Sequence, residues 1–550
     1  MDRILKMPEW AFMLLIAALA LVIFLPYIGN VHLFDWDEIN FAESAREMIL
    51  TGDYTRVKIN FLPFWEKPPL FIWLQAASMN IFGINEFAAR FPNILTGVAT
   101  LLVLAWIGRR EYDRKFSIIW VIVYAGSLLT HFYFRTAIID PLFNLFIFLG
   151  IYQAYLSFSK EKSPKKYSIH SLWAGLFIGL AIITKGPVAL LIFLITSLII
   201  LLWYRKTIRL HFYDILLFGL SCLVISTIWF GYETYKNGIW FIQRFISYQI
   251  TLFTTEDSGH GGPFYYHWLV LLIGCFPASI FFMGALKKQT GLTDRQRLWI
   301  KWNIILFFSH LILFSIVKTK IIHYSSLCYF PLSFLATVQL YRIYKGEVKL
   351  AVWQKWIFAI VGILLSIVFM AMVFIGRNTQ LIIPYVKDKF AVANLGADVD
   401  WPIMLYLIGF LFLVMIISYL LINKLLSLSR LLIPFIAIII LMQFILICYV
   451  PRIEQYSQAS MIEFYQSLQK QDVYVSSLGF KSYGQYFYTD RQASYNTTIN
   501  DTRIIQPEPL DKPAYIVLKI HQVKDYPMLT NYTNLGSKNG YAFYKREMGK

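Results

Sequence analysis

Carboxylate side chains stand at the start of a helix-like stretch early in the chain. Residues 35–38 read Asp-Trp-Asp-Glu, and apolar residues recur at helical spacing through 41–48, before Gly52. The pattern predicts a short amphipathic helix with acids in its first turn and a glycine after its last turn. At a membrane surface such acids are either ordinary helix caps or groups that face water or a cavity and act there. Asp37 and Glu38 are the candidates for the second role.

A second isolated acid, Asp140, has apolar residues on both sides and is followed by Pro141. An Asp directly before a Pro fits the N-cap of a helix, a contact that stabilises a helix by about 1 kcal/mol. One carboxylate can cap a helix and also take part in chemistry, so both interpretations of Asp140 stay open.

Cations gather beside the breaks and ends of the apolar runs. Lys185 lies in the Thr-Lys-Gly-Pro break at 184–187, and a broken helix frees backbone N–H groups that bind anions. A lysine there could instead extend along the helix to reach water. Residues 318–324 add two lysines, a histidine and a tyrosine. An anionic substrate would explain these groups, which are Lys185, Lys318, Lys320, His323 and Tyr324.

A metal site is a further hypothesis. His260 lies in a Gly-rich turn within the long connection at 232–266, and no His-x₃-His spacing accompanies it. A lone histidine is usually not a ligand, but Glu66 and His260 together could hold a divalent metal ion. The sequence contains no Walker motif and no dinucleotide fingerprint. We therefore expect no nucleotide, and the energy for a transfer reaction would come from an activated lipid.

The composition requires a bilayer around these groups. Of 550 residues, 58% are hydrophobic and only 15% are charged, which is more apolar side chain than a soluble fold can bury. The net charge of +18 does not indicate nucleic-acid binding, because the lysines and arginines lie in short tracts between apolar runs. The four cysteines lie in apolar segments and predict no disulfide framework.

About thirteen apolar runs are candidates for membrane-spanning helices. With a cytoplasmic N-terminus, six inside connections are rich in Lys or Arg, as the positive-inside rule requires. This arrangement places the loop at 29–88 and residues 450–550 outside. The runs lie near residues 10–28, 89–108, 116–134, 138–158, 170–183, 186–204, 214–231, 267–286, 300–317, 325–341, 355–375, 402–422 and 431–449.

The last hundred residues change character. A helix-like stretch at 458–469 precedes β-rich runs at 473–475 and 515–518. The predicted fold class is therefore a polytopic α-helical membrane protein with a small C-terminal α/β domain. The predicted domains are a transmembrane domain at 1–449, with its functional outer loop at 29–88, and an extracytoplasmic domain at 450–550.

Several motifs occur together in the first 345 residues. They include Asp37-Glu38-x-x-Phe41-Ala42-Glu43-x-Ala45-Arg46-Glu47-Met48, Glu66-Lys67-Pro68-Pro69-Leu70, and the stretches 135–141, 184–187, 260–266 and 318–324. In order and position they resemble landmarks of the bacterial GT-C glycosyltransferases. The resemblance is to the group of aminoarabinose transferases and protein O-mannosyltransferase-like enzymes, and it covers about residues 10–345.

The resemblance implies an inverting transfer of a sugar from a polyprenyl-phosphate carrier to a glycolipid or protein acceptor. The reaction would occur at the periplasmic face of a bacterial inner membrane. By this likeness Asp37 is the catalytic carboxylate and Asp140 a second essential acid. Lys67 would hold the donor phosphate, and Tyr324 would help to orient it.

Two positions depart from the pattern of that group. Asn40 and Leu252 stand where a basic residue is usual, which favours a related sugar transferase over the lipid A enzyme itself. A lipid flippase or transporter without transfer chemistry is the alternative. Against it, the sequence shows no inverted repeat, and the polar residues cluster at one face of the membrane.

Overall fold

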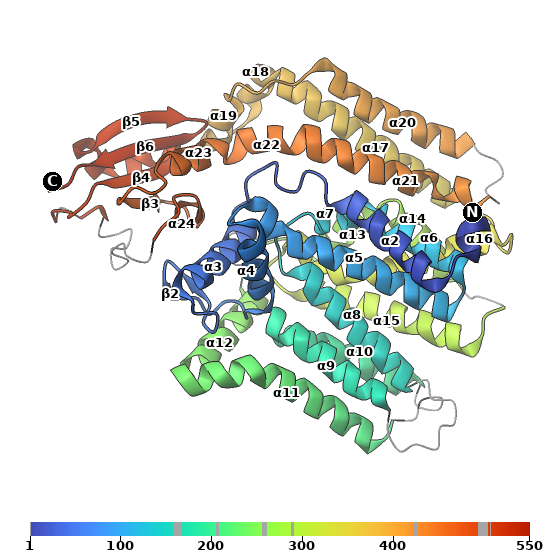
Figure 1. The fold of residues 1–550 in the computed structure, drawn as a ribbon. Helices are drawn as coiled ribbons and strands as arrows, with labels where there is room; N and C mark the ends of the chain where they lie inside the picture. Colours follow the sequence, from blue (N-terminus) through green and yellow to red (C-terminus); the bar gives the residue numbers. More distant parts are fainter. Residues whose placement is uncertain are drawn as a thin grey trace.

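The structure is a computed structural model in which helices form a bundle and a small sheet lies at one end, near the C-terminus (Figure 1). It describes residues 2–158, 168–204, 208, 210–255, 261–287, 291–421, 427–492, 504–506 and 508–549.

Within these ranges seven helices are long and apolar enough to cross a membrane. They are α5 (Glu86–Glu111), α8 (Asp140–Phe158), α11 (Phe212–Asn237), α15 (Asp294–Ile316), α17 (Val352–Arg377), the segment Ile403–Leu421 that contains α20 (Tyr406–Leu421), and the segment Leu428–Ser457 that contains α21 (Leu428–Phe444) and α22 (Val450–Ser457). A bent pair that meets at 109° would add an eighth, namely α13 (Tyr266–Gly274) and α14 (Ala278–Ala285). Shorter apolar helices are α2 (Glu9–Phe24), α4 (Leu70–Phe82), α9 (Ile169–Thr184) and α10 (Val188–Tyr204).

Each predicted apolar run lies mostly on helix in the structure, where α6 (Arg114–Ala125), α7 (Leu128–Tyr133) and α16 (Tyr329–Tyr344) complete the set. The predicted break is confirmed, because α9 ends at Thr184 and α10 begins at Val188. The connection at 232–266 is not only a loop, since α12 (Trp240–Thr254) occupies its middle.

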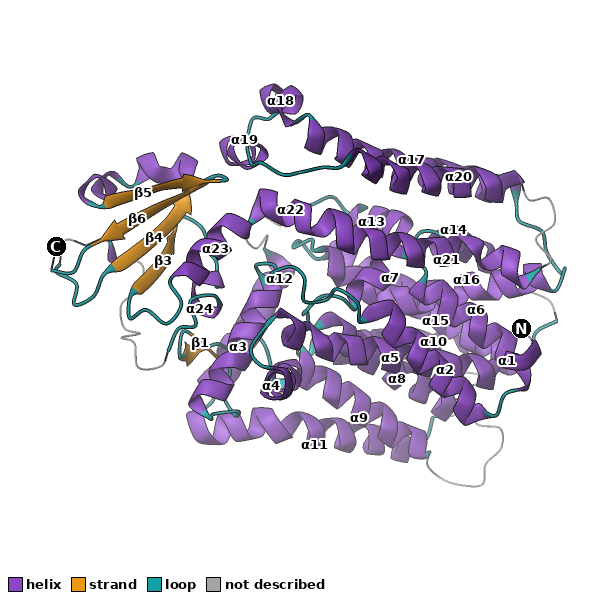
Figure 2. Cartoon of the chain, turned by 45° about the horizontal axis from the view of Figure 1, so that its top comes forward, coloured by secondary structure: helices purple, strands orange, loops and turns teal. Residues whose placement is uncertain are grey.

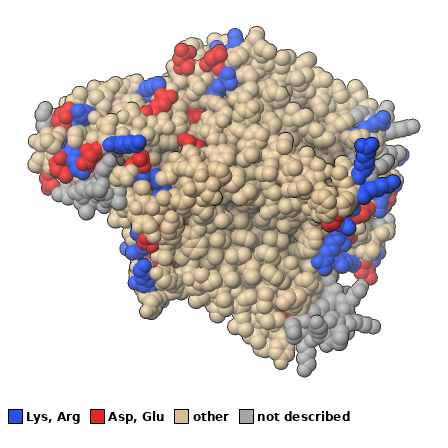
Figure 3. All heavy atoms as spheres, viewed as in Figure 1, with Lys and Arg blue, Asp and Glu red and all other residues tan. Residues whose placement is uncertain are grey.

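Charged side chains are concentrated at the two ends of the bundle. A wide uncharged belt separates them in Figure 3. On α11, which carries one part of this surface, Leu223, Val224 and Ile228 are 60–63% exposed. Apolar side chains of this kind need lipid around them, so the bundle is embedded in a membrane with its helices running across it.

The segment between α2 and α5 folds into α3 (Asp37–Thr51), the short strands β1 (Lys58–Ile59) and β2 (Leu62–Pro63), and α4. The predicted helix is confirmed, and Gly52 ends it in the left-handed conformation at φ 66°, which glycine adopts without steric cost. Its surroundings differ from those of an interfacial helix, because every residue from Glu38 to Met48 is buried.

The C-terminal sheet is mixed and has the strand order β3-β4-β6-β5. Strands β3 (Tyr474–Leu478) and β4 (Ala514–Lys519) are parallel and fall on the two predicted β-rich runs. Strands β5 (Thr533–Lys538) and β6 (Tyr541–Arg546) complete it as antiparallel neighbours. Helices α23 (Ala459–Ser467) and α24 (Gly484–Phe487) lie between the sheet and the helix bundle (Figure 2).

Candidate active site

A pocket lies where α8 begins, where α9 gives way to α10, and where α12 approaches the end of α15. It contains several of the predicted site residues. Its lining is Lys67, Asp140, Phe143, Asn144, Lys185, Val188, Gln249, Phe253, His310, Phe314, Val317 and Tyr324.

Asp140 and Lys185 form the innermost ion pair of this pocket. The Lys185 ammonium lies 2.5 Å from Asp140 Oδ1, and the Asp140 side chain is only 4% exposed. The ammonium also lies 5.0 Å from the centre of the Tyr324 ring and 5.7 Å from that of Phe143. Lys185 therefore turns into the protein at the helix break, where the carboxylate and two rings hold its charge.

His323 links the two acids that the sequence analysis placed in catalytic roles. It lies in the 3₁₀ helix η1 (Ile322–Cys328), with Nε2 3.6 Å from Asp37 Oδ2 and 3.8 Å from Asp140 Oδ2. Burial lowers the pKa of His323, whereas Asp140 and Asp37 act to raise it. Both separations exceed a normal hydrogen bond. The two carboxylates therefore share one neighbour, and neither has its hydrogen-bonding capacity filled by it.

Asp37 keeps its carboxylate available. It is the first residue of α3, and its side chain is 28% exposed. Within the described ranges, its side-chain oxygens accept no hydrogen bond, and His323 is their only ion-pair neighbour. An ionised acid at a helix N-terminus is stabilised by the helix dipole and can still accept a proton from a ligand.

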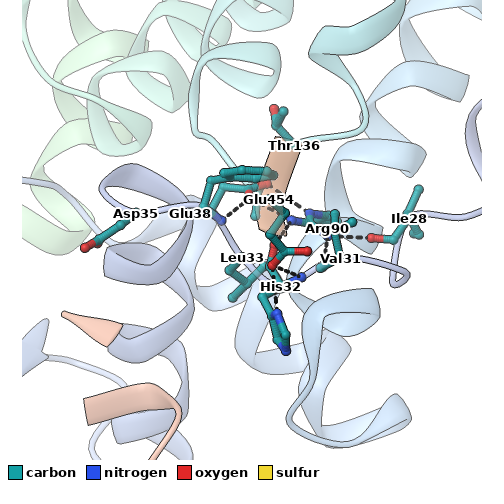
Figure 4. A network of polar contacts seen from close by, with 12 residues as sticks. Ile28, Val31, His32, Leu33, Asp35, Glu38, Arg90, Thr136 and Glu454 are labelled. Atoms are coloured by element: carbon teal, nitrogen blue, oxygen red, sulfur yellow. Dashed lines mark hydrogen bonds and ion pairs between the residues drawn. The ribbon is translucent and has the colours of Figure 1, made fainter. Parts of the chain in front are cut away.

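The neighbouring acid, Glu38, is fully used by the fold. Its two carboxylate oxygens accept both arms of the Arg90 guanidinium at 3.0 and 2.8 Å, the backbone N–H of Phe34 at 2.8 Å and that of Ala137 at 2.6 Å. The side chain is buried, and Figure 4 shows it at the centre of this network. The prediction that Glu38 binds substrate finds no support, because its oxygens are already satisfied.

The predicted cations also differ in whether the protein itself already occupies their hydrogen-bond donors. Lys320 is buried, and its ammonium donates to the carbonyls of Phe314, Ser315 and Val317 at the end of α15. It thus caps a helix C-terminus, and none of its three donors remains for a substrate. Lys318 is exposed and lines a separate open pocket of about 450 Å³.

Lys67 lines the main pocket and has a different environment. Its ammonium lies 5.6 Å from the centre of the Tyr248 ring on α12. No carboxylate of the described chain lies within ion-pair distance of it. Lys67 is therefore the pocket cation with the most freedom to bind an added anion.

Of the two residues proposed to hold a metal ion, only Glu66 belongs to the described part of the chain. Glu66 is half-buried, while His260 lies outside the described residues. In the part of the chain that the structure describes, no group of three or more His, Cys, Asp and Glu side chains could hold a metal ion. The described side chains therefore do not fit such an ion.

Sequence reasoning missed His310 and Asn144. His310 is buried on α15, and its Nε2 lies 2.9 Å from the Tyr324 carbonyl oxygen. Asn144 donates to the hydroxyls of Tyr133 and Ser326 at 2.6 and 2.8 Å. A polar side chain inside an apolar span is itself a signal of function, and both residues carried that signal.

This chain is similar in sequence to known glycosyltransferases. Residues 66–229 match the family described as dolichyl-phosphate-mannose-protein mannosyltransferase. An undecaprenyl phosphate-alpha-4-amino-4-deoxy-L-arabinose arabinosyl transferase from Shewanella sediminis is 25% identical over 336 residues, which cover 60% of each chain. Its counterpart from Pectobacterium carotovorum is 27% identical over 327 residues, covering 58% of this chain and 56% of the relative. The matched part thus spans less than two thirds of these relatives.

The fold comparison extends over nearly the whole molecule. The apo crystal structure of ArnT from Cupriavidus metallidurans has a TM-score of 0.74 and 17% identity, covering 98% of both chains. The structure of the same protein bound to undecaprenyl phosphate gives 0.73 and 16% over the same coverage. The resemblance predicted from the motifs is therefore confirmed: the chain has the GT-C fold and is similar to the aminoarabinosyl transferases of that class.

Proposed function

We propose that this protein is an inverting glycosyltransferase that moves a sugar from undecaprenyl phosphate, or a related polyprenyl phosphate, to an acceptor outside the cytoplasm. The observation that carries the proposal is the pairing of Asp37 and Asp140 around His323, beside a pocket that contains Lys67 and Lys185. A cationic pocket next to a free carboxylate suits a phosphate leaving group and a hydroxyl nucleophile.

The donor phosphate would bind first at Lys67, which has no carboxylate partner in the described chain. Lys185 is already paired with Asp140 at 2.5 Å, so it would add attraction to the phosphate through its remaining donors. Preorganised cations of this kind stabilise the charge that develops on a leaving phosphate, and each contact can contribute a few kcal/mol. Tyr324 lies beside Lys185 and would restrict the position of its ammonium.

In the transfer step, Asp37 would take the proton of an acceptor hydroxyl. The hydroxyl oxygen then attacks the anomeric carbon from the face opposite the phosphate. The bond from this carbon to the phosphate oxygen breaks, and the polyprenyl phosphate leaves with the electron pair. Asp140 orients Lys185 and His323. If the acceptor is a phosphate group that is already ionised, Asp37 instead orients the acceptor or stabilises positive charge on the sugar.

We place the protein in a bacterial inner membrane with thirteen spanning helices. The pocket, the outer segment 29–88 and the C-terminal domain at 450–550 would face the periplasm, and residues 1–449 would form the membrane domain. The positive-inside rule supports this orientation through the six basic connections on the other side. The clustering of charge at the two ends of the bundle in Figure 3 agrees with it.

For the acceptor we propose a glycolipid such as lipid A, with a protein hydroxyl as the second candidate. The relatives that match in sequence are named for an aminoarabinose donor on undecaprenyl phosphate. A flippase without transfer chemistry is disfavoured, because Asp37, whose carboxylate is incompletely paired, and the cation pocket lie at the same end of the helix bundle.

The test is a transfer assay with purified protein in proteoliposomes. Radiolabelled polyprenyl-phosphate sugars would be supplied with a crude outer-leaflet extract of glycolipids and proteins, for wild type and Asp37→Asn. We expect label to move into one acceptor fraction and the variant to lose nearly all of this transfer, with only a small residual rate. The matched control is Asp53→Asn, which removes an acid of the same outer segment that is paired with Lys58 at 2.7 Å. Carrier exchange across the bilayer without any transfer would contradict the proposal.

A further inference from the structure

The five residues that lead into Asp37, residues 32–36, form a segment held by side chains. Each of the first four backbone N–H groups donates to a side chain and not to another main-chain group. His32 N–H donates to Glu454 at 3.1 Å and Leu33 N–H to the Tyr488 hydroxyl at 2.6 Å. Phe34 and Asp35 N–H donate to Glu38 at 2.8 Å and to Gln458 at 3.2 Å. This segment has no regular secondary structure of its own to fix its path.

Its carbonyl groups are held in the same manner. Arg90 donates to the carbonyls of Val31 and His32, both at 2.8 Å, and Figure 4 shows these bonds converging on one guanidinium. The amide nitrogen of Gln458 donates to the Leu33 carbonyl at 2.8 Å. Gln458 thus binds the main chain twice, at residues 33 and 35, much as a neighbouring strand would.

Three of these holding side chains come from the C-terminal part of the chain. Glu454 lies on α22, Gln458 joins α22 to α23, and Tyr488 directly follows α24. Gln458 is only 6% exposed.

The last residue of the segment, Trp36, makes ring contacts with the same C-terminal part. The ring of Tyr483 lies 5.0 Å from that of Trp36, and the Lys481 ammonium lies 4.1 Å from its centre. The C-terminal part therefore contacts the segment along its length, as far as residue 36, which directly precedes Asp37.

From these contacts we propose that Gln458 is a positioning residue for Asp37, and that the C-terminal domain sets the geometry of the catalytic acid. The proposal rests on the function proposed above. Asp37 has one ion-pair neighbour, His323 at 3.6 Å, and no hydrogen bond to fix its carboxylate within the described ranges. Its position is therefore determined by the backbone before it and by the start of α3.

The expected consequence follows from the sensitivity of catalysis to geometry. A displacement of about 1 Å at a reacting group can reduce the rate by about 100-fold. Replacing Gln458 by Ala removes both bonds to the segment, but leaves Glu454, Tyr488 and Arg90 in place. The protein should fold while the acid moves.

The experiment compares Gln458→Ala with Asp490→Asn. Asp490 also joins the C-terminal domain to α3, through Arg46 at 3.2 Å, and within the described ranges its side chain makes no hydrogen bond or ion pair with the segment 32–36. Transfer is measured as kcat and donor KM in proteoliposomes, and the amides of residues 33–35 are followed by hydrogen exchange. We expect Gln458→Ala to lower kcat about 10- to 100-fold, with donor KM within about twofold. These amides should exchange faster, and Asp490→Asn should resemble wild type in both readouts.

The background of Asp37→Asn separates positioning from general destabilisation. If Gln458 acts through Asp37, adding Gln458→Ala there should reduce the residual transfer no further. A further large reduction, or an equal loss in Asp490→Asn, would overturn the proposal. A wild-type protein with no transfer would contradict the proposed function instead. Hydrogen exchange would then test whether Gln458 holds the segment 32–36. Unchanged exchange of the amides of residues 33–35 in Gln458→Ala would overturn the positioning proposal.

Discussion

A buried carboxylate lies near each end of helix α8, and the partners of the two differ. Asp140 is the first residue of α8, and Glu111, the last residue of α5, bonds to tyrosines near the other end of α8. At one end Glu111, with a fully buried side chain, accepts two bonds from Arg295 at 2.8 and 2.7 Å and one each from Tyr152 and Tyr155 at 2.8 and 2.9 Å. At the other end Asp140 receives one bond, from Lys185, and among the described residues its second oxygen has only His323 nearby, at 3.8 Å. Fifteen residues of helix separate Asp140 and Tyr155, which is about 22 Å.

The difference distinguishes a structural acid from a reactive one. A buried charge with every lone pair occupied contributes to the fold and offers nothing to a ligand. A buried charge that is incompletely paired is retained at a cost in stability, and such groups cluster at functional sites. Asp140 is of the second kind, and the partly exposed Asp37 is likewise incompletely paired, while Glu111 and Glu38 belong to the first.

The largest effect should come from breaking the incompletely paired end. Asp140→Asn removes the partner of Lys185 and one neighbour of His323. We expect transfer to fall by about 100- to 1,000-fold, because both groups lose their orientation toward the pocket. The variant should also be less stable, because Lys185 is left without its charge partner, so transfer is compared per folded molecule. Activity within threefold of wild type would remove Asp140 from the site.

Replacing Glu111, the fully paired carboxylate, should affect stability and not the reaction. Glu111→Gln leaves Arg295 without its charge partner, and we expect the free energy of unfolding to fall by about 2 kcal/mol. The fall is limited because Arg295 is 46% exposed. Thermal unfolding in detergent measures it, and transfer per folded molecule should stay within about twofold. Arg297→Gln is the control, because its pair with Asp294 is at the surface and contributes almost nothing.

A smaller effect is expected at Lys67, which lines the pocket. Lys67→Met removes the cation that lies over Tyr248, and we expect donor KM to rise about tenfold, or about 1.4 kcal/mol. Lys58→Met serves as the control, since Lys58 is on the same outer segment but is paired with Asp53. An equal rise in both variants would indicate a general surface charge effect and not a phosphate contact.

The smallest effect concerns pH. Burial raises the pKa of Asp35 from 3.8 to about 6, against hydrogen bonds from Ser482 and Tyr483 that lower it. The folded state therefore binds this proton more tightly than the unfolded state, so stability should fall as pH rises from about 4 through 6. Asp35→Asn should remove about 1 kcal/mol of this fall, as seen by thermal unfolding between pH 5 and pH 8. An unchanged pH dependence would contradict it.

The sequence was sufficient for those features that depend on local pattern. Helix α3 and its terminal Gly52 follow from apolar spacing, and the break after Thr184 follows from Gly186-Pro187. The role of Lys185 needed the fold, because a lysine at a break can face water or turn inward. Only the structure shows it against Asp140, 45 residues away in the sequence.

The features that the sequence could not give are partners that lie far away along the chain. Glu38 and Asp37 have the same chemistry in the sequence, but Arg90 binds one of them 52 residues later. Lys320 similarly resembles a substrate-binding cation until the free carbonyls of α15 are seen around it. The segment before Asp37 is held by residues more than 400 positions away, and no local pattern could reveal this.

The decisive comparison is between Asp37→Asn and Glu111→Gln in the same proteoliposomes. Transfer and thermal unfolding are recorded for both variants. We expect opposite results: Asp37→Asn should be folded as stably as wild type but with transfer lowered about 100- to 10,000-fold, and Glu111→Gln should be less stable but active per folded molecule. Wild-type-like transfer by Asp37→Asn would contradict the assignment of the reactive acid to this end of the molecule.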